Sequence, residues 1–245
     1  MRLRALAAAV AIGLAAASTV LAARTRAPRL TVFAAASLTN VFPRIDPHGR
    51  YSFGGSNTLA AQIEQGLPVD VFASANTALP WQLHRKGLVT RPVVFTSNRL
   101  VVVIAHGNPL HLDSVRQLER QDLRIVMAAA GVPVGDYTRK VLARMGLSDL
   151  VGKAVSQETD VREVLAKVTL GEADAGFVYA TDAKSVAGKV SLLGLPKAAE
   201  PQVLYAAAAV KSSKHLQAAK AWIQRLLSKP AQKKLRAAGF LRIPR

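Results

Sequence analysis

The segment SFGGSNTLAAQIEQGLPVDVFASAN, residues 52–76, decides the fold class of this chain. A short apolar strand predicted over 51–53 leads into it, Ser56 precedes a predicted helix over 57–65, and a second apolar strand follows over 69–73. A strand, a helix and a further strand in succession are typical of a sheet that carries helices on its faces. The segment therefore predicts an α/β protein.

The same alternation continues through the rest of the chain and predicts two α/β lobes, each a mainly parallel sheet flanked by helices. We expect residues 24–98 and 211–245 in the first lobe and 99–210 in the second, with crossover strands near 100–105 and 203–210. Ligands in such folds bind beyond the carboxyl ends of the strands, so the cleft between the lobes is the expected binding site. Further strands are predicted over 29–36, 123–128 and 175–179, and further helices over 77–86, 134–145, 160–170, from 181 onward, 214–227 and 230–238.

The first 23 residues have the pattern of a secretory signal peptide. A basic stretch, Met1–Arg4, precedes an apolar run over 5–23 that ends in the small residues of a cleavage site. We therefore expect a protein exported to the periplasm or another extracytoplasmic location. An uncleaved membrane anchor is the alternative, because the run approaches spanning length.

The composition excludes several kinds of site. The 245 residues contain no cysteine, which rules out disulfides, thiolate nucleophiles and thiolate metal ligands. The formal net charge of +18 predicts a basic surface, which could also attract anionic envelope polymers or steer an anionic ligand. Nucleic-acid binding is a weaker reading, because the basic residues are spread along the chain without an aromatic stacking pattern.

Five points in the chain place a small or polar residue where a strand or loop ends and a helix begins. The first turn of a helix has backbone N–H groups without an intrahelical acceptor and carries partial positive charge. Several such helix starts that converge make an anion site without charged side chains. Each residue alone is also explained as a helix cap or as packing, so the hypothesis depends on the joint pattern. The five points are residues 36–37, 55–57, 132–135, 159–161 and 179–181, where Ser37, Ser56 and Tyr179 add hydroxyl groups.

The two amide candidates follow from the expected caps. Asp160 and Glu163 fit a capping box, which makes Val161 the first helical residue and leaves its N–H free. Pro133 suits the first position of its helix and leaves the N–H of Val134 free in the same way.

Taken together, these segments resemble the periplasmic molybdate-binding proteins of ABC importers, and the resemblance covers nearly all of the chain after the signal peptide. The matching blocks, in chain order, are VFAAASLTNVF (32–42), residues 52–76 quoted above, GVPVGDYTRKVL (131–142), TDVREVL (159–165) and AGFVYATDA (175–183).

The resemblance implies a two-lobed type II binding-protein fold that closes on molybdate, with tungstate bound comparably. It implies hydroxyl donors at Ser37, Ser56 and Tyr179 and backbone amide donors at Val134 and Val161. The metal would be bound only as its oxyanion, without a cofactor, by a monomer that delivers it to a membrane permease.

The sequence departs from this family pattern in two places. The segment between Ser37 and Ser56 is short and contains Pro43, which predicts a truncated first helix. Val134 stands where better-known members have alanine, so its side chain is expected to reshape the pocket wall.

From the residues alone, two other functions remain open and two are disfavoured. The ligand could be another tetrahedral oxyanion, such as sulfate or phosphate, and a basic envelope-associated interaction protein would not need the five helix starts. An enzyme is not expected, because the five histidines are scattered and no nucleophile–base pair stands out. A regulatory effector domain is disfavoured by the export signal.

Overall fold

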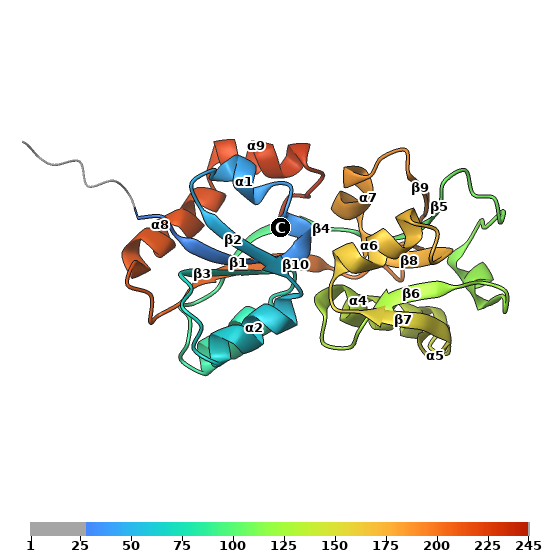
Figure 1. Cartoon of the computed structure of the whole chain (residues 1–245), viewed down its shortest axis with the longest axis horizontal. Coiled ribbons are helices and arrows are strands. Elements are labelled where there is room, and N and C mark those ends of the chain that lie inside the picture. Colours follow the sequence, from blue (N-terminus) through green and yellow to red (C-terminus); the bar gives the residue numbers. More distant parts are fainter. Residues whose placement is uncertain (1–27, 245) are drawn as a thin grey trace, which may run out of the picture.

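The computed structural model describes residues 28–244 and shows two lobes side by side, each built on one five-stranded sheet (Figure 1). The predicted signal peptide, residues 1–23, lies outside the described residues. Over residues 28–244 no helix is long and apolar enough to cross a membrane.

Lobe 1 contains the first sheet, in which β10 lies between β3 and β4. The segment 52–76 forms the expected strand–helix–strand unit, and β1 pairs in parallel with both β2 and β3. β10 runs antiparallel to both of its neighbours. The strands in spatial order are β2 (Arg50–Gly54), β1 (Thr31–Ala35), β3 (Val71–Ser74), β10 (Val203–Ala209) and β4 (Val93–Asn98).

Lobe 2 repeats this arrangement with the second sheet. β6 pairs in parallel with β7 and β8, whereas β5 runs antiparallel to β8 and β9. The two-lobed α/β fold is thus confirmed, but both sheets are mixed rather than mainly parallel, because one crossover strand enters each of them in the reverse direction. The strands in spatial order are β7 (Ala154–Glu158), β6 (Ile125–Ala128), β8 (Ala175–Tyr179), β5 (Leu100–Ala105) and β9 (Val190–Leu193).

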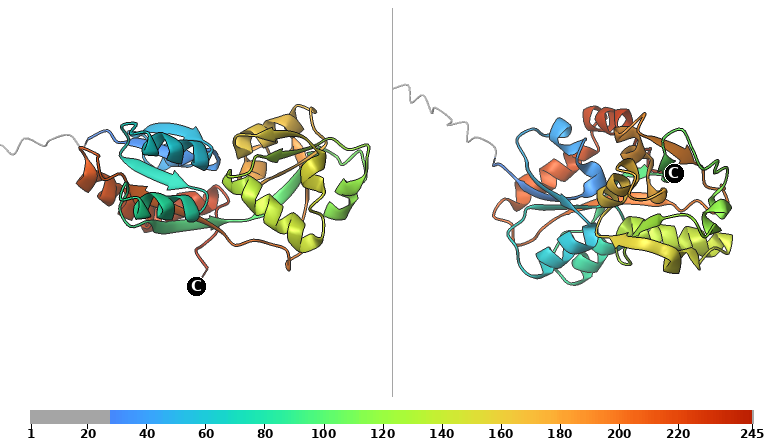
Figure 2. Two further views of the ribbon diagram at one scale, coloured as in Figure 1. Left: turned by 90° about the horizontal axis from the view of Figure 1, so that it is seen from below. Right: turned by 45° about the vertical axis from the view of Figure 1, so that its right-hand side comes forward.

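The chain passes between the lobes twice, from β4 to β5 and from β9 to β10 (Figure 2). The expected lobe boundary at residue 210 is therefore wrong, because β10 is hydrogen-bonded into the sheet of lobe 1. An apolar run such as 203–209 predicts a strand but does not say which sheet accepts it.

Helices cover both faces of each sheet. In lobe 1, alternating side chains of β1 divide between two packed layers: Phe33 packs with α2 and α3, and Val32 belongs to the main core with Phe42 and Trp222 on the other face. The helices of lobe 1 are α1 (Phe42–Ile45), α2 (Ser56–Glu64), α3 (Ala78–Arg85), α8 (Leu216–Leu226) and α9 (Lys229–Ala237), with a 3-10 turn η1 at Ala36–Leu38. Those of lobe 2 are η2 (Val115–Glu119), α4 (Pro133–Met145), α5 (Leu150–Lys153), α6 (Val161–Thr169) and α7 (Ala180–Ser185).

The truncated first helix is confirmed. Where the family pattern has a helix after the first strand, this chain forms only the three-residue turn η1 and then the four-residue helix α1. Pro43 occupies the first turn of α1, where its missing N–H costs no hydrogen bond. The break leaves Ser37 in place directly after β1.

Candidate functional site

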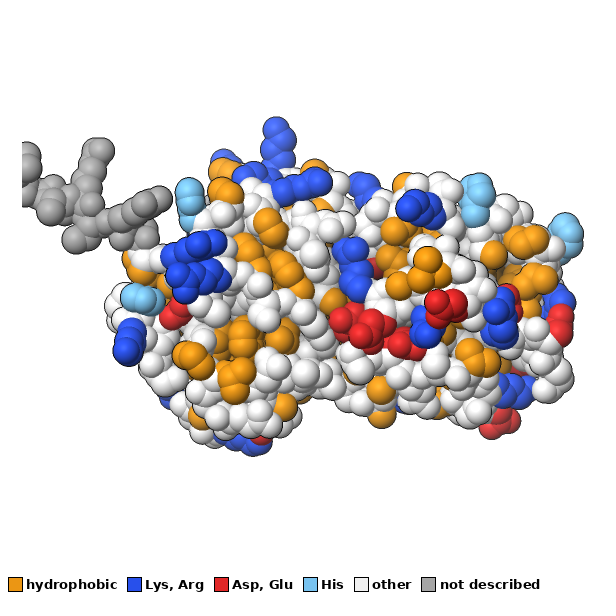
Figure 3. Space-filling model, in the orientation of Figure 1, with side chains coloured by type: hydrophobic (Ala, Val, Ile, Leu, Met, Phe, Trp, Pro, Cys, Tyr) orange, Lys and Arg blue, Asp and Glu red, His pale blue; other side chains and the backbone are white. Residues whose placement is uncertain are grey.

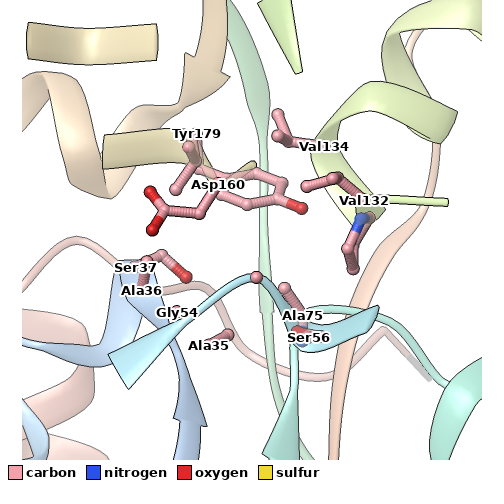
Figure 4. A pocket seen from close by; sticks show the side chains of 13 residues that line it. Ala35, Ala36, Ser37, Gly54, Ser56, Ala75, Val132, Val134, Asp160 and Tyr179 are labelled. Carbon is pink, nitrogen blue, oxygen red and sulfur yellow. Dashed lines mark hydrogen bonds between the residues drawn. The ribbon is translucent and has the colours of Figure 1, made fainter. Parts of the chain in front are cut away.

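All five candidate residues line one pocket between the two lobes (Figure 4). Ser37 and Ser56 come from lobe 1, and Val134, Val161 and Tyr179 come from lobe 2. Each of the five is at most 4% exposed. The structure therefore brings together, from five separate segments, every residue that the helix-start pattern predicts.

The lobe 1 wall presents two buried serine hydroxyls. Ser37 lies in η1 immediately after β1, and Ser56 is the first residue of α2. The backbone N–H of Ala75, at the end of β3, donates to Ser56 Oγ over 3.1 Å. Because that oxygen already accepts a hydrogen bond, the hydroxyl proton of Ser56 is free to point into the pocket.

The lobe 2 wall presents two helix N-termini. Val161 is the first residue of α6, and the carboxylate of its N-cap, Asp160, accepts from the N–H groups of Arg162 (2.6 Å) and Glu163 (3.2 Å). The cap thus leaves the Val161 N–H for another acceptor. The Glu163 side chain departs from the expected capping box, because it accepts from the N–H and hydroxyl of Thr159, one residue earlier.

The second helix N-terminus is that of α4. Pro133 and Val134 are its first two residues, and the Val134 side chain is buried in the pocket wall. A side chain on Gly135 would overlap the carbonyl oxygens of Ala128 and Ala129, so glycine lets α4 begin against the end of β6.

Tyr179 supplies the remaining hydroxyl. It ends β8 and caps α7, and its ring is buried. Within residues 28–244 its hydroxyl has no hydrogen-bond partner, and in Figure 4 it points into the space between the lobes. Burial raises the pKa of Tyr179 well above its usual value, so the phenol stays neutral and keeps a proton to donate.

A buried ion pair lies directly behind this wall. Asp182, three residues after Tyr179, is fully buried, and its Oδ1 lies 3.0 Å from Nε of Arg162 without the geometry of a hydrogen bond. Burial raises the pKa of Asp182 to about 7, and the charge of Arg162 opposes this shift only in part. Asp182 therefore changes its charge near neutral pH.

The pocket itself contains no cationic side chain among its lining residues, and Asp160 is the one carboxylate. No group of three metal-ligating side chains occurs within the described part of the chain. The pocket is small, about 10 Å³, which is close to the space that one water molecule needs. The arrangement suits a small dehydrated anion held by neutral donors.

A larger cavity of about 270 Å³ adjoins the pocket, and Ser37 lines both. Three cationic side chains line it: Arg44 from lobe 1, and Arg162 and Lys184 from lobe 2. On the face shown in Figure 3, other basic side chains are spread over both lobes. The cations thus lie outside the pocket, in the cavity next to it.

Sequence reasoning missed the residues that support the two serines. Ala75 could have been found, because it follows a strand whose carboxyl end faces the cleft. Tyr205, which hydrogen-bonds to Ser37, and Asn98, which hydrogen-bonds to Tyr205, give no such signal. Both lie in strands that are far from Ser37 in the chain.

Comparisons with known proteins agree with this geometry. Residues 30–241 match the model of the family described as bacterial extracellular solute-binding protein. The molybdate-binding protein ModA of Mycobacterium tuberculosis is 36% identical over 221 residues, covering 86% of this chain and 84% of the relative. The periplasmic molybdate-binding protein of Azotobacter vinelandii shares the fold, with a TM-score of 0.78 at 23% identity, over 89% of this chain and all of that one.

One more distant relative carries an enzyme name. A Pseudomonas protein called aconitate isomerase is 29% identical over 192 residues, covering 75% of this chain and 71% of the relative. Since the family model spans nearly all of the described residues, this chain belongs to the bacterial extracellular solute-binding protein family.

Proposed function

We propose that this protein captures molybdate outside the cytoplasm and delivers it to the permease of an ABC importer, and that tungstate binds comparably. The observation that carries the proposal is the convergence of three buried hydroxyls and two helix N-termini on one pocket between the lobes. The protein acts as a monomer in this proposal and uses no cofactor, because the metal enters only as its oxyanion.

The five donors match a tetrahedral oxyanion. We infer that the hydroxyls of Ser37, Ser56 and Tyr179 and the N–H groups of Val134 and Val161 each donate to the ligand. Hydrogen bonds to a charged acceptor are about twice as strong as neutral ones, and in a dry pocket they replace the hydration shell of the ion. Neutral donors also avoid holding the anion too tightly for release to a permease.

A different tetrahedral oxyanion is the nearest alternative. Selectivity then depends on the size of the closed pocket and on the fixed set of donors. Sulfate is smaller than molybdate and would leave the donors further from its oxygens. Molybdate and tungstate, which are nearly the same size, would be bound alike.

An isomerase acting on a tricarboxylate is disfavoured by the pocket. A cavity of about 10 Å³ would have to expand many times to hold a six-carbon tricarboxylate, whereas a small displacement of the lobes admits a four-oxygen anion. The pocket lining also lacks the cationic side chains that would neutralise three carboxylates.

Isothermal titration calorimetry of the exported chain tests the proposal. We expect tight binding of molybdate and tungstate and weak binding of sulfate and phosphate. The double substitution Ser37→Ala with Ser56→Ala is expected to weaken molybdate binding at least 100-fold, since each lost hydrogen bond to a charged group costs roughly 1.5–3 kcal/mol.

The matched control is Ser148→Ala with Ser212→Ala, which removes two exposed hydroxyls and should leave binding unchanged. Equal affinity for sulfate and molybdate would refute the proposed ligand. Unchanged affinity after loss of both pocket serines would refute the proposed site.

A further inference from the structure

Tyr205 holds one of the pocket serines although it does not line the pocket itself. It lies on β10, is fully buried, and its hydroxyl is 2.8 Å from Oγ of Ser37, which is 168 residues away in the chain. The Nδ2 atom of Asn98, the last residue of β4, lies 3.3 Å from the same phenol oxygen. The Tyr205 hydroxyl therefore has two side-chain partners, Ser37 and Asn98.

The direction of these hydrogen bonds follows from the backbone N–H of Arg99, which can only donate. The backbone N–H of Arg99 donates to Oδ1 of Asn98 over 2.9 Å, which fixes which amide atom is the oxygen. The other amide atom is then the nitrogen, and it donates to Tyr205 Oη and, over 2.9 Å, to Thr181 Oγ1. Because the phenol oxygen accepts from Asn98, its own proton is directed to Ser37 Oγ.

We propose that Tyr205 is a positioning residue that makes Ser37 a hydrogen-bond donor to the ligand, and this inference rests on the proposed function. Ser37 Oγ accepts a hydrogen bond from the Tyr205 hydroxyl, so the proton of Ser37 can turn into the pocket. Ser56 is oriented in the same way by the Ala75 N–H. Both serines then favour an oxyanion that carries no proton, and they disfavour the hydrogen phosphate ion, whose O–H needs an acceptor.

The chain of hydrogen bonds also connects the two lobes. Asn98 belongs to lobe 1 and lies next to the first crossover, whereas Thr181 is in α7 of lobe 2. The amide group that orients Tyr205 is thus itself held by a side chain of the opposite lobe.

A double-mutant cycle tests whether Tyr205 acts through Ser37. We expect Tyr205→Phe to weaken molybdate binding about tenfold in the wild-type chain and to have almost no effect in a Ser37→Ala chain, because the group it orients is then absent. Asn98→Leu, which removes the donor behind Tyr205, is expected to show the same dependence on Ser37. A purely structural role would instead give additive losses, which would overturn the proposal.

Selectivity provides a second readout. Tyr205→Phe frees the Ser37 oxygen to accept, so the affinity ratio of phosphate to sulfate is expected to rise several-fold. Tyr51→Phe is the matched control, because the Tyr51 hydroxyl donates to the carbonyl oxygen of Asp46 (2.7 Å), outside the pocket lining. That variant should change neither the ratio nor the affinity.

The outcomes separate the two proposals. Wild-type protein that binds sulfate but not molybdate would refute the proposed ligand, and the same cycle measured with sulfate would still test Tyr205. Wild-type protein that binds molybdate, with additive losses in both cycles and an unchanged phosphate-to-sulfate ratio, would refute only the role of Tyr205.

Discussion

Gly55 of lobe 1 faces the carbonyl oxygen of Thr159 of lobe 2 so closely that a Cβ atom on Gly55 would overlap it. Gly55 is the N-cap of α2, and Thr159 directly precedes the N-cap of α6. The helix starts that supply Ser56 and Val161 thus meet backbone to backbone. The approach of the two lobes at the pocket depends on the missing side chain at Gly55.

We expect Gly55→Ala to weaken molybdate binding more than tenfold while leaving the melting temperature of the ligand-free protein nearly unchanged. The added methyl group meets the backbone of the opposite lobe most closely, and the nearest atom in its own lobe is the side-chain Oδ1 of Asn57, at 2.8 Å. Calorimetry measures the affinity, and small-angle scattering with ligand measures the closure. Gly152→Ala is the control, because a Cβ there contacts nothing. Wild-type affinity in Gly55→Ala would contradict this role.

Gly135→Ala, unlike Gly55→Ala, is expected to lower the stability of the ligand-free protein. Its Cβ would overlap the carbonyl oxygens of Ala128 and Ala129, which belong to the same lobe. Lobe 2 must distort even in the absence of ligand, so the melting temperature is expected to fall by several degrees. Thermal unfolding followed by circular dichroism checks this, and an unchanged melting temperature would show that α4 can shift at no cost.

Tyr179→Phe is expected to weaken molybdate binding about 10- to 100-fold without lowering stability. Its buried hydroxyl has no partner within the described residues, so its removal costs the ligand-free protein no hydrogen bond. Tyr51→Phe should show the reverse, because the Tyr51 hydroxyl donates to the carbonyl oxygens of Phe42 and Asp46. A stability loss in Tyr179→Phe with unchanged affinity would place its hydroxyl outside the ligand site.

Molybdate affinity is expected to fall between pH 6 and pH 8 in the wild-type protein and to stay level in Asp182→Asn. Burial raises the pKa of Asp182 to about 7, so its carboxylate becomes charged behind Tyr179 over this range, while Arg162 offsets part of the charge. Calorimetry across this range measures the effect. An equal fall in both proteins would assign the pH dependence to another group.

The same group predicts a pH dependence of stability. The folded-state pKa of Asp182 lies above the usual value of 3.8, so the folded protein binds this proton more tightly than the unfolded chain does. The resulting stabilisation is complete below about pH 3.8 and is lost as the pH rises through about 7. Asp182→Asn is therefore expected to raise the melting temperature relative to wild type, and to raise it more at pH 8 than at pH 5.

Arg44→Gln is expected to slow molybdate association several-fold at low salt and to reduce its dependence on ionic strength. Arg44 is exposed and lines the cationic cavity next to the pocket, where it can attract an approaching dianion. Stopped-flow tryptophan fluorescence measures the rate, with Lys220→Gln on α8 as a control of equal charge. Equal slowing in both variants would mean that only the net charge matters.

Much of the fold and the helix starts that line the pocket could be predicted from local sequence, and the family resemblance selected the five candidate residues among them. Capping residues, glycines and apolar runs indicated where α2, α4 and α6 begin, because the residues that cap a helix are close to its first residue in the sequence. Strands β4, β7 and β9 were missed, because none of them has more than three apolar residues in succession.

The partners of the pocket residues could not be predicted in this way. Tyr205 contacts Ser37 only because segments that are distant in the sequence pack together, and Asp182 is buried for the same reason. Which sheet accepts β10 is likewise settled by the register with β3 and β4 and not by its alanine-rich sequence.

The position of β10 also determines the order in which the two lobes can be completed as the chain emerges. Lobe 2 is one continuous stretch from β5 to β9, whereas the sheet of lobe 1 has a gap between β3 and β4 until a strand near the C-terminus fills it. A chain that emerges N-terminus first therefore completes its second lobe before its first. Ser37 and Ser56 are among the first residues to emerge, yet their half of the binding site forms only when the last fifth of the chain arrives.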